Sequence, residues 1–188
     1  AYSYAAQGRI VQLGLDPYVF GPGSLGGGFA GQADPLWLWT PAPYGPLALQ
    51  IQNAIVELMR SNPYASAVGM RLPAIASLVV IAVLLPRIAT ALGRDPRFAL
   101  WLGVLNPLTV LHLLGGAHND ALMVGLLVAG LAVAGRDPTA RRLVLATVIV
   151  SAAALVKVPA AAGLASISLG VGTALRMRGV ERTDTDAG

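Results

Sequence analysis

The segment FALWLGVLNPLTVLHLLGGAHNDALMVGLLVAGLAVAG, residues 98–135, carries the pattern from which the rest of the chain can be interpreted. It holds two apolar runs, residues 98–117 and 121–135, separated by His118-Asn119-Asp120. Such runs predict membrane-spanning helices, because about 20 apolar helical residues cross the hydrocarbon core. An imidazole and a carboxylate between two such runs are costly unless they face water, protein or substrate. These three polar residues are therefore candidates for a functional site.

The composition of the whole chain agrees with a membrane protein. Of the 188 residues, 55% are hydrophobic and only 12% are charged, and the mean hydropathy is +0.67. This leaves too little polar surface for a soluble globule, so we expect an all-α, multi-pass transmembrane fold. Cysteine is absent, which excludes a disulfide framework and thiol chemistry. The net charge of +4 comes without a dense basic run, so nucleic acid is not an expected partner.

Residues 1–66 differ in kind from the rest. They are rich in proline and glycine, which is typical of loops and turns, yet they contain all five tyrosines and two of the three tryptophans. A disordered linker would not concentrate aromatic residues in this way. We predict an ordered extracytoplasmic loop over residues 1–66. A short amphipathic helix at residues 47–60 closes it, with Glu57 and Arg60 spaced for an ion pair.

The rest of the chain predicts transmembrane helices over residues 67–175, followed by a polar cytoplasmic tail at 176–188. The expected helices cover residues 67–92, 98–117, 121–135, 143–157 and 159–175. Asn106-Pro107 predicts a kink in the second helix. The last apolar stretch is too long for one untilted span. It forms either two short helices that meet near Lys157 or a single long tilted helix.

Arginines predict which ends of the helices face the cytoplasm. They cluster at two turns, as Arg87, Arg94 and Arg97 and as Arg136, Arg141 and Arg142. The positive-inside rule places both turns in the cytoplasm. The intervening turn with His118-Asn119-Asp120 then lies on the opposite side, together with the aromatic loop. The basic tail also favours the cytoplasm, which two short helices allow and a single long helix does not.

Lys157 is the only lysine in the chain. With two short helices it lies at the extracytoplasmic tip, on the same side as His118-Asn119-Asp120 and the aromatic loop. This combination suits a substrate with an anionic group, hydroxyl groups and an apolar tail, such as a polyprenyl-phosphate sugar. Sugar transfer from such a lipid needs a cation for the departing phosphate and a carboxylate for the proton of the attacking hydroxyl.

Five motifs, in this order, resemble a known family. They are YSYAAQG at residues 2–8, GLDPY at 14–18, TPAPYGP at 40–46, WLGVLNP at 101–107 and GGAHND at 115–120. The chain resembles, from residue 1 to about 157, the actinobacterial polyprenol-phosphate-mannose-dependent α-1,6-mannosyltransferases of the GT-C superfamily. The resemblance implies a multi-pass GT-C fold in the cell membrane. It also implies a polyprenyl-phosphate mannose donor, a mannan or lipomannan acceptor, and an active face outside the cytoplasm.

The resemblance also bears on the catalytic base. Enzymes of this superfamily usually place an essential carboxylate in the first large extracytoplasmic loop. In the resembling proteins an acidic residue lies just upstream of the segment that matches residues 1–4. We therefore expect this chain to carry the binding half of the site and to lack that base. Within the chain, Asp120 and Asp16 are the catalytic candidates.

Six residues are candidates for substrate binding: Lys157, His118, Asn119, Arg9, Tyr44 and Trp37. Several of these side chains also have a plain structural explanation. Asn119 or Asp120 could cap the following helix, and Lys157 could extend its side chain from an ordinary helix end. Asp16 precedes a proline, which is a common turn device, and the aromatic residues could form an interfacial belt.

We expect no cofactor and no metal site, because the two histidines and the scattered aspartates lack ligand spacing. His112 lies within an apolar run and predicts a buried core histidine. A divalent cation held at Asp120 is compatible with the sequence.

Two other functions compete with glycosyl transfer. A polytopic transporter or lipid flippase would need polar residues through the whole depth of the bilayer. A non-catalytic membrane scaffold would explain the missing base. The polar residues of this chain gather at one face, which favours the enzyme.

Overall fold

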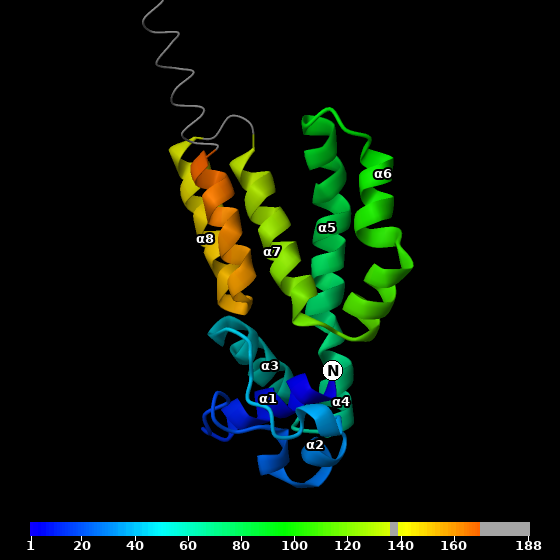
Figure 1. The fold of residues 1–188 in the computed structure, drawn as a ribbon, viewed down its shortest axis with the longest axis vertical. Coiled ribbons are helices and arrows are strands. Elements are labelled where there is room, and N and C mark those ends of the chain that lie inside the picture. The colour runs from blue at the N-terminus through cyan, green and yellow to red at the C-terminus, as the bar shows by residue number, and fades with distance from the viewer. Residues whose placement is uncertain (136–138, 170–188) are drawn as a thin grey trace, which may run out of the picture.

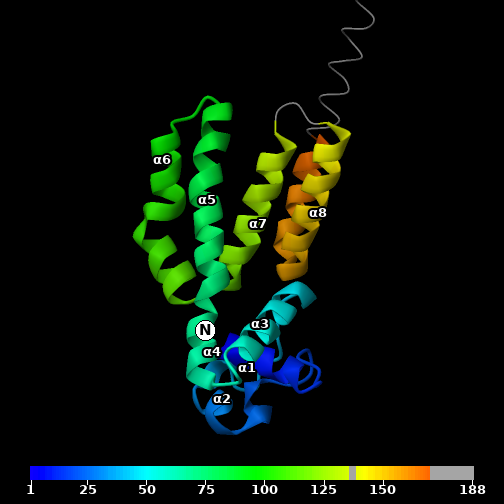
Figure 2. The same cartoon turned by 180° about the vertical axis from the view of Figure 1, so that it is seen from behind.

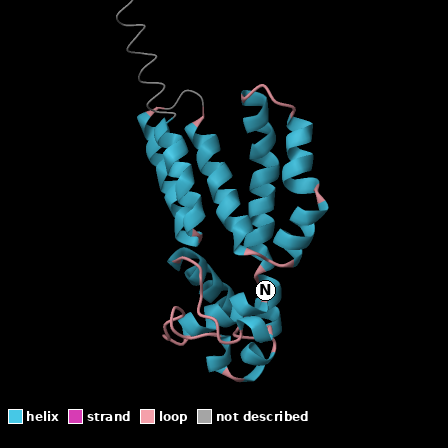
Figure 3. Cartoon of the chain, viewed as in Figure 1, coloured by secondary structure: helices cyan, strands magenta, loops and turns pink. Residues whose placement is uncertain are grey.

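The computed structural model describes residues 1–135 and 139–169. These residues form helices joined by short loops, with no β-strand in either range (Figure 3). An elongated bundle of helices stands on a layer of shorter helices, which covers one of its ends (Figure 1). The view from behind shows the same two parts (Figure 2). The predicted all-α fold is thus confirmed for the described residues.

The covering layer is built from the first 69 residues. Its elements are α1 (Tyr2–Gln12), η1 (Pro22–Leu25), α2 (Gly27–Gly31), η2 (Pro35–Trp37), α3 (Pro46–Leu58) and α4 (Pro63–Gly69). Four of these begin with a proline in the first turn. Proline fits there because the first N–H groups of a helix have no partner within the helix. The prolines of the predicted loop therefore mark where short helices begin.

Helix α3 corresponds to the amphipathic helix predicted at residues 47–60, but it ends earlier. Leu58 is its last residue, and Arg60 adopts a positive φ of 52° beyond the helix end. The expected pair of Glu57 and Arg60 is wrong, since the ion pairs of the described residues do not include it. A residue past the helix end no longer lies one turn from Glu57.

A small apolar core holds the layer together and attaches it to the bundle. Tyr4 and Ala5 of α1 pack there against Ile55 and Val56 of α3. Helices α1 and α3 approach closely at Gly8, where an added Cβ would lie 2.5 Å from the carbonyl oxygen of Gln52. Ala117, from the turn before α7, belongs to the same core. This turn therefore has a fixed position relative to α1.

The bundle consists of longer and more apolar helices. They are α5 (Arg71–Ala91), α6 (Pro96–Leu100), the π-helical turns η3 (Trp101–Leu105) and η4 (Thr109–Gly115), α7 (Asn119–Ala134), α8 (Ala140–Val156) and η5 (Val158–Ala161). Helix continues from η5 through residue 169. Within the described ranges, the helix Pro63–Ala91 is long and apolar enough to cross a membrane, and the bent pair Pro96–Leu105 and Thr109–Gly115 would be a second span if counted as one. The multi-pass arrangement therefore remains a prediction.

The kink predicted at Asn106-Pro107 is confirmed. The helical axis bends there by 50°. Asn106 is extended, with a ψ of 147°, as is typical of a residue before proline. Its side chain bridges the break, because Nδ2 donates to Thr109 Oγ1 at 2.8 Å and Oδ1 accepts from the Thr109 N–H at 2.9 Å.

The chain reverses its direction at Lys157. Helix α8 ends at Val156, and Lys157 is extended, with φ −157° and ψ 128°. Leu164 and Ile167 of the following helix pack back against Ala146 and Val150. Of the two alternatives for the last apolar stretch, the structure shows the pair of short helices. Residues 170–188, with the predicted tail and the end of the last predicted helix, lie outside the described residues.

The two ends of the bundle differ in charge. The turn between α5 and α6 and the start of α8 lie at the end remote from the covering layer (Figure 1). Arg94 and Arg97 flank the first of these, and Arg141 and Arg142 begin α8. Lys157 lies at the other end, where the Gly45 N–H donates to the Val156 carbonyl at 3.0 Å. Arg136 and the arginines of the tail lie outside the described residues.

Candidate functional site

A pocket of about 580 Å³ lies between the covering layer and the end of the bundle. Its volume falls within the range of about 300–1,000 Å³ that is usual for sites that bind small molecules. Its polar lining comes from helix α1, from the loop segment that includes Gln32 to Tyr44, and from the bundle. The bundle contributes His112, His118, Asp120 and Lys157. Segments far apart in the sequence thus meet at one place.

An ion pair between Lys157 and Asp120 forms the charged part of this pocket. Lys157 Nζ lies 2.7 Å from Asp120 Oδ1, and the two side chains are 34% and 28% exposed. Asp120 lies in the first turn of α7, where the helix dipole favours a carboxylate. Lys157 Nζ also lies 5.9 Å from the ring centroid of Tyr44, within the range of a cation–π contact. Both charges therefore remain accessible from the pocket.

His118 connects this pair to two tyrosines of the covering layer. Its Nδ1 lies 3.0 Å from the Tyr4 hydroxyl and 4.0 Å from Asp120 Oδ2. The Tyr44 hydroxyl donates to the Tyr4 oxygen at 3.2 Å. Three side chains from three different segments are thus linked in a row that ends beside the carboxylate.

Burial sets the protonation states in this row. Burial lowers the pKa of His118, and the neighbouring His112 lowers it further. Burial raises the pKa of Tyr4 far above its usual value, and its hydrogen bond with Tyr44 adds to this. At neutral pH His118 is therefore a neutral imidazole, and the Tyr4 hydroxyl keeps its proton.

The turn before α7 presents His118 in an uncommon backbone conformation. Ala117 has a positive φ of 51°, which costs energy for a residue with a Cβ, and it is 2% exposed. His118 occupies the cap position of α7, but no side chain caps this helix end. The capping explanation for Asn119 and Asp120 therefore does not hold. Asn119 is buried and is not among the residues that line the pocket.

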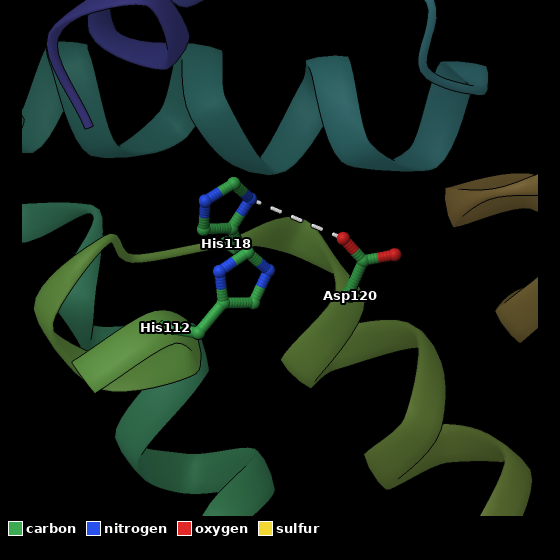
Figure 4. Close-up of side chains that lie close together, drawn as sticks. All are labelled: His112, His118 and Asp120. Atoms are coloured by element: carbon green, nitrogen blue, oxygen red, sulfur yellow. Dashed lines mark ion pairs between the residues drawn. The ribbon is translucent and has the colours of Figure 1, made fainter. Parts of the chain in front are cut away.

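His112 lies at the pocket, and the prediction of a buried core histidine is wrong. It is exposed, and its ring stacks on that of His118 with a centroid distance of 4.1 Å and an interplanar angle of 14°. Figure 4 shows the two rings one over the other, with the Asp120 carboxylate beside them. The bend at Asn106-Pro107 and the π-helical turns change the direction in which the side chains of residues 109–115 point. A count along one regular helix therefore could not place the ring.

The other candidates divide into two groups. Tyr44 and Trp37 line the pocket, as expected of residues that contact substrate. Arg9 and Asp16 are not among the lining residues. The Arg9 guanidinium donates to Ser61 Oγ at 3.0 Å, and Asp16 accepts the Tyr18 N–H at 2.8 Å. The turn explanation therefore describes Asp16.

Sequence reasoning missed several lining residues besides His112, namely Tyr4, Gln7 and Gln32. Asp34, which precedes a proline as Asp16 does, lines the pocket and also caps η2, since its Oδ1 accepts the Leu36 N–H at 2.8 Å. For Tyr4, the aromatic content of the first motif was a usable signal. The position of Gln7 at the pocket depends on how α1 packs on α3. No sequence pattern predicts this packing.

The described residues thus define an all-helical protein with a charged and aromatic pocket at one end of an apolar bundle. Comparison with known proteins places it more narrowly. The model of the family described as alpha-(1->6)-mannopyranosyltransferase, N-terminal domain, matches residues 1–173. The chain belongs to this family.

Individual relatives agree with this assignment. The chain is 38% identical to alpha-(1->6)-mannopyranosyltransferase A of Mycobacterium tuberculosis over 84% of its own length and 31% of the relative. It is 36% identical to alpha-(1->6)-mannopyranosyltransferase A of Corynebacterium glutamicum over 87% of its length and 32% of that protein. The chain therefore spans about a third of the length of these curated relatives. No solved structure matches it.

Proposed function

We propose that this chain takes part in moving mannose from a polyprenyl-phosphate donor to a mannan acceptor, in α-1,6 linkage, on the extracytoplasmic side of a cell membrane. The names of the relatives support mannosyl transfer. The pocket supports the donor, because it combines a cation, a carboxylate and aromatic side chains beside an apolar bundle. The ion pair of Lys157 and Asp120 inside this pocket is the observation that carries the proposal.

Charge at the two ends of the bundle supports the proposed orientation. The described end remote from the pocket carries five arginines, namely Arg87, Arg94, Arg97, Arg141 and Arg142, whereas the pocket side with its covering layer carries Arg9, Arg60, Arg71 and Lys157. The positive-inside rule assigns the end with more arginines to the cytoplasm. The pocket then opens on the extracytoplasmic side, where a polyprenyl chain can lie along the bundle with its phosphate at the membrane surface.

Lys157 is the proposed phosphate ligand. Without substrate its ammonium group is held by Asp120. A donor phosphate would compete for the same ammonium group, because charge-assisted contacts to phosphate and to carboxylate are alike in kind. Binding of the donor then releases Asp120 from its partner and leaves a free carboxylate in the pocket.

Of the two catalytic candidates within this chain, Asp120 is the one that lines the pocket, and we propose its released carboxylate as the base. An acceptor hydroxyl attacks the anomeric carbon of the mannose, and the bond from this carbon to the phosphate oxygen breaks. The proton of the hydroxyl passes to Asp120, and the electron pair stays on the departing phosphate beside Lys157. Asp16 has no comparable place, since it does not line the pocket.

The remaining lining residues fit the sugar. Tyr44 and Trp37 offer flat apolar faces with polar edges, which suit the faces of a hexose. The neutral His118 and the protonated Tyr4 offer hydrogen bonds to hydroxyl groups without adding charge.

Replacing the cation tests the proposal. In purified full-length protein, Lys157→Met should lower kcat/KM for mannose transfer from a radiolabelled lipid donor by about a hundredfold. Lys157→Arg should retain more activity than Lys157→Met, because it keeps the charge. Arg60→Met removes an exposed cation of the covering layer outside the pocket and should leave the rate unchanged. Normal transfer by Lys157→Met would overturn the role of Lys157.

A further inference from the structure

We propose that His112, His118 and Asp120 bind a divalent transition-metal ion of the zinc class at the edge of the pocket. One ligand atom from each of the three residues lies within 4.8 Å of the other two. The residues come from η4, from the turn before α7 and from the first turn of α7, so the bend of the chain brings them together. Figure 4 shows both rings and the carboxylate around one small region.

The type of ligand selects the type of ion. Two imidazoles and one carboxylate form a common ligand set of zinc sites that keep a position open for water or substrate. Imidazole suits zinc, copper, iron and nickel, whereas magnesium and calcium prefer oxygen ligands. Bonds of about 2.0–2.2 Å would bring the ligand atoms somewhat closer than they are now. His112 is exposed, and the described contacts include no hydrogen bond from its ring, so this ring is free to tilt.

The stacking of the two rings also favours a cation. Two imidazoles stacked at 4.1 Å repel one another when both are protonated, so the pair is stable with at least one neutral ring. Neutral imidazoles present the lone pair that a metal ion needs. The same Nδ1 of His118 lies 4.0 Å from Asp120 Oδ2 and 3.0 Å from the Tyr4 hydroxyl, so an ion bound there would take the place of this hydroxyl.

A second feature of the pocket favours a bound ligand. The side chain of Gln7 lines the pocket and is only 5% exposed, yet its Oε1 has no hydrogen-bond partner among the described residues. A buried carbonyl oxygen without a partner is costly, and water on a bound ion or a substrate hydroxyl would satisfy it.

The proposed ion and Lys157 share one ligand. Lys157 Nζ holds Asp120 Oδ1, and the other oxygen of the same carboxylate faces His118. The ammonium group draws negative charge away from the metal site and repels a cation. Removal of Lys157 should therefore strengthen metal binding, although the same change weakens sugar transfer. If the proposed function holds, the ion binds Asp120 through Oδ2, and Oδ1, once Lys157 releases it, accepts the proton of the acceptor hydroxyl.

Cobalt binding tests this site directly. Purified, tag-free full-length protein is freed of metal in detergent and titrated with Co²⁺, whose visible absorption reports coordination by nitrogen and oxygen ligands. We expect one Co²⁺ per chain. His112→Asn, His118→Asn and Asp120→Asn should each weaken binding by about tenfold or more. Lys157→Met should strengthen it several-fold.

Asp34→Asn is the matched control. It neutralises another carboxylate of the same pocket and keeps a residue that caps η2 well, so it should bind Co²⁺ as the unmodified protein does. Absence of saturable binding, or binding that survives all three ligand substitutions, would overturn the metal site. Co²⁺ binding without mannose transfer would overturn the proposed function alone. Loss of transfer in Lys157→Met without any Co²⁺ binding would overturn the metal site alone.

Discussion

The side chains of the candidate site contact partners that are far away in the sequence. Asp120 and Lys157 are 37 residues apart and form an ion pair, and Tyr4 reaches His118 across 114 residues. The sequence predicted that Lys157 and His118-Asn119-Asp120 would lie at the same end of the helices. Two predicted helices separate them, so the chain returns to the end from which it started. The ion pair itself could not be predicted, since it depends on side-chain directions in a tertiary contact.

Neutralising Asp120 should separate donor binding from catalysis. Asp120→Asn removes the partner that competes for Lys157, so the KM for the lipid donor should fall. It also removes the proposed base, so kcat should fall by about a hundredfold or more. Steady-state mannose transfer at varied donor concentration gives both values. An unchanged kcat would show that the proton leaves by another route.

His118 should make the protein less stable in acid. Its pKa is lower in the folded state than its ordinary value of 6.5, so the unfolded chain binds the proton more readily. Stability is therefore lost as the pH falls through about 6.5. Thermal denaturation between about pH 7 and pH 5 should show a steeper fall for the unmodified protein than for His118→Asn, which has no group that titrates in this range. Equal slopes would contradict this.

The secondary-structure elements could be predicted from the sequence where hydrophobicity alone determines them. Apolar runs between arginine-bearing turns predicted the long helices, and Asn106-Pro107 predicted the bend. The short helices of residues 1–66 other than α3 were missed, because each is stabilised mainly by packing in the covering layer and not by its own length. The place of His112 was missed for a related reason, since π-helical turns after a bend break the regular spacing on which a sequence-based count relies.

Gly45 should prove essential for joining the covering layer to the tip at Lys157. A Cβ at this position would collide with the carbonyl oxygen of Leu155, next to the hydrogen bond from Gly45 to Val156. Gly45→Ala should therefore lower stability by about 1–3 kcal/mol and reduce mannose transfer, because Tyr44 and Lys157 move apart. Thermal denaturation in detergent measures the first effect. Gly31→Ala adds a methyl group in open space and should change neither.

The molecule as a whole places a polar pocket between a helical bundle and a layer that covers its end. The ion pair of Lys157 and Asp120 lies at the pocket end of the bundle, and most of the described arginines of the bundle lie at its other end. An enzyme that takes a sugar from a lipid and passes it to a water-soluble chain needs such a boundary position. The sequence predicted this polarity from charge and hydropathy, whereas the pocket itself required the packing of α1 and of the Tyr44 loop against the bundle.

The side of the membrane on which the pocket opens can be measured most directly by cysteine labelling, since the chain has no cysteine of its own. Thr40 lies at the pocket, and Leu92 lies at the far end of α5 with its side chain 61% exposed. Each is replaced by cysteine in a separate variant, Thr40→Cys and Leu92→Cys. In intact cells a membrane-impermeant maleimide should label the first variant and should label the second only after permeabilisation. Labelling of Leu92→Cys from outside, with Thr40→Cys protected, would contradict an extracytoplasmic site for sugar transfer.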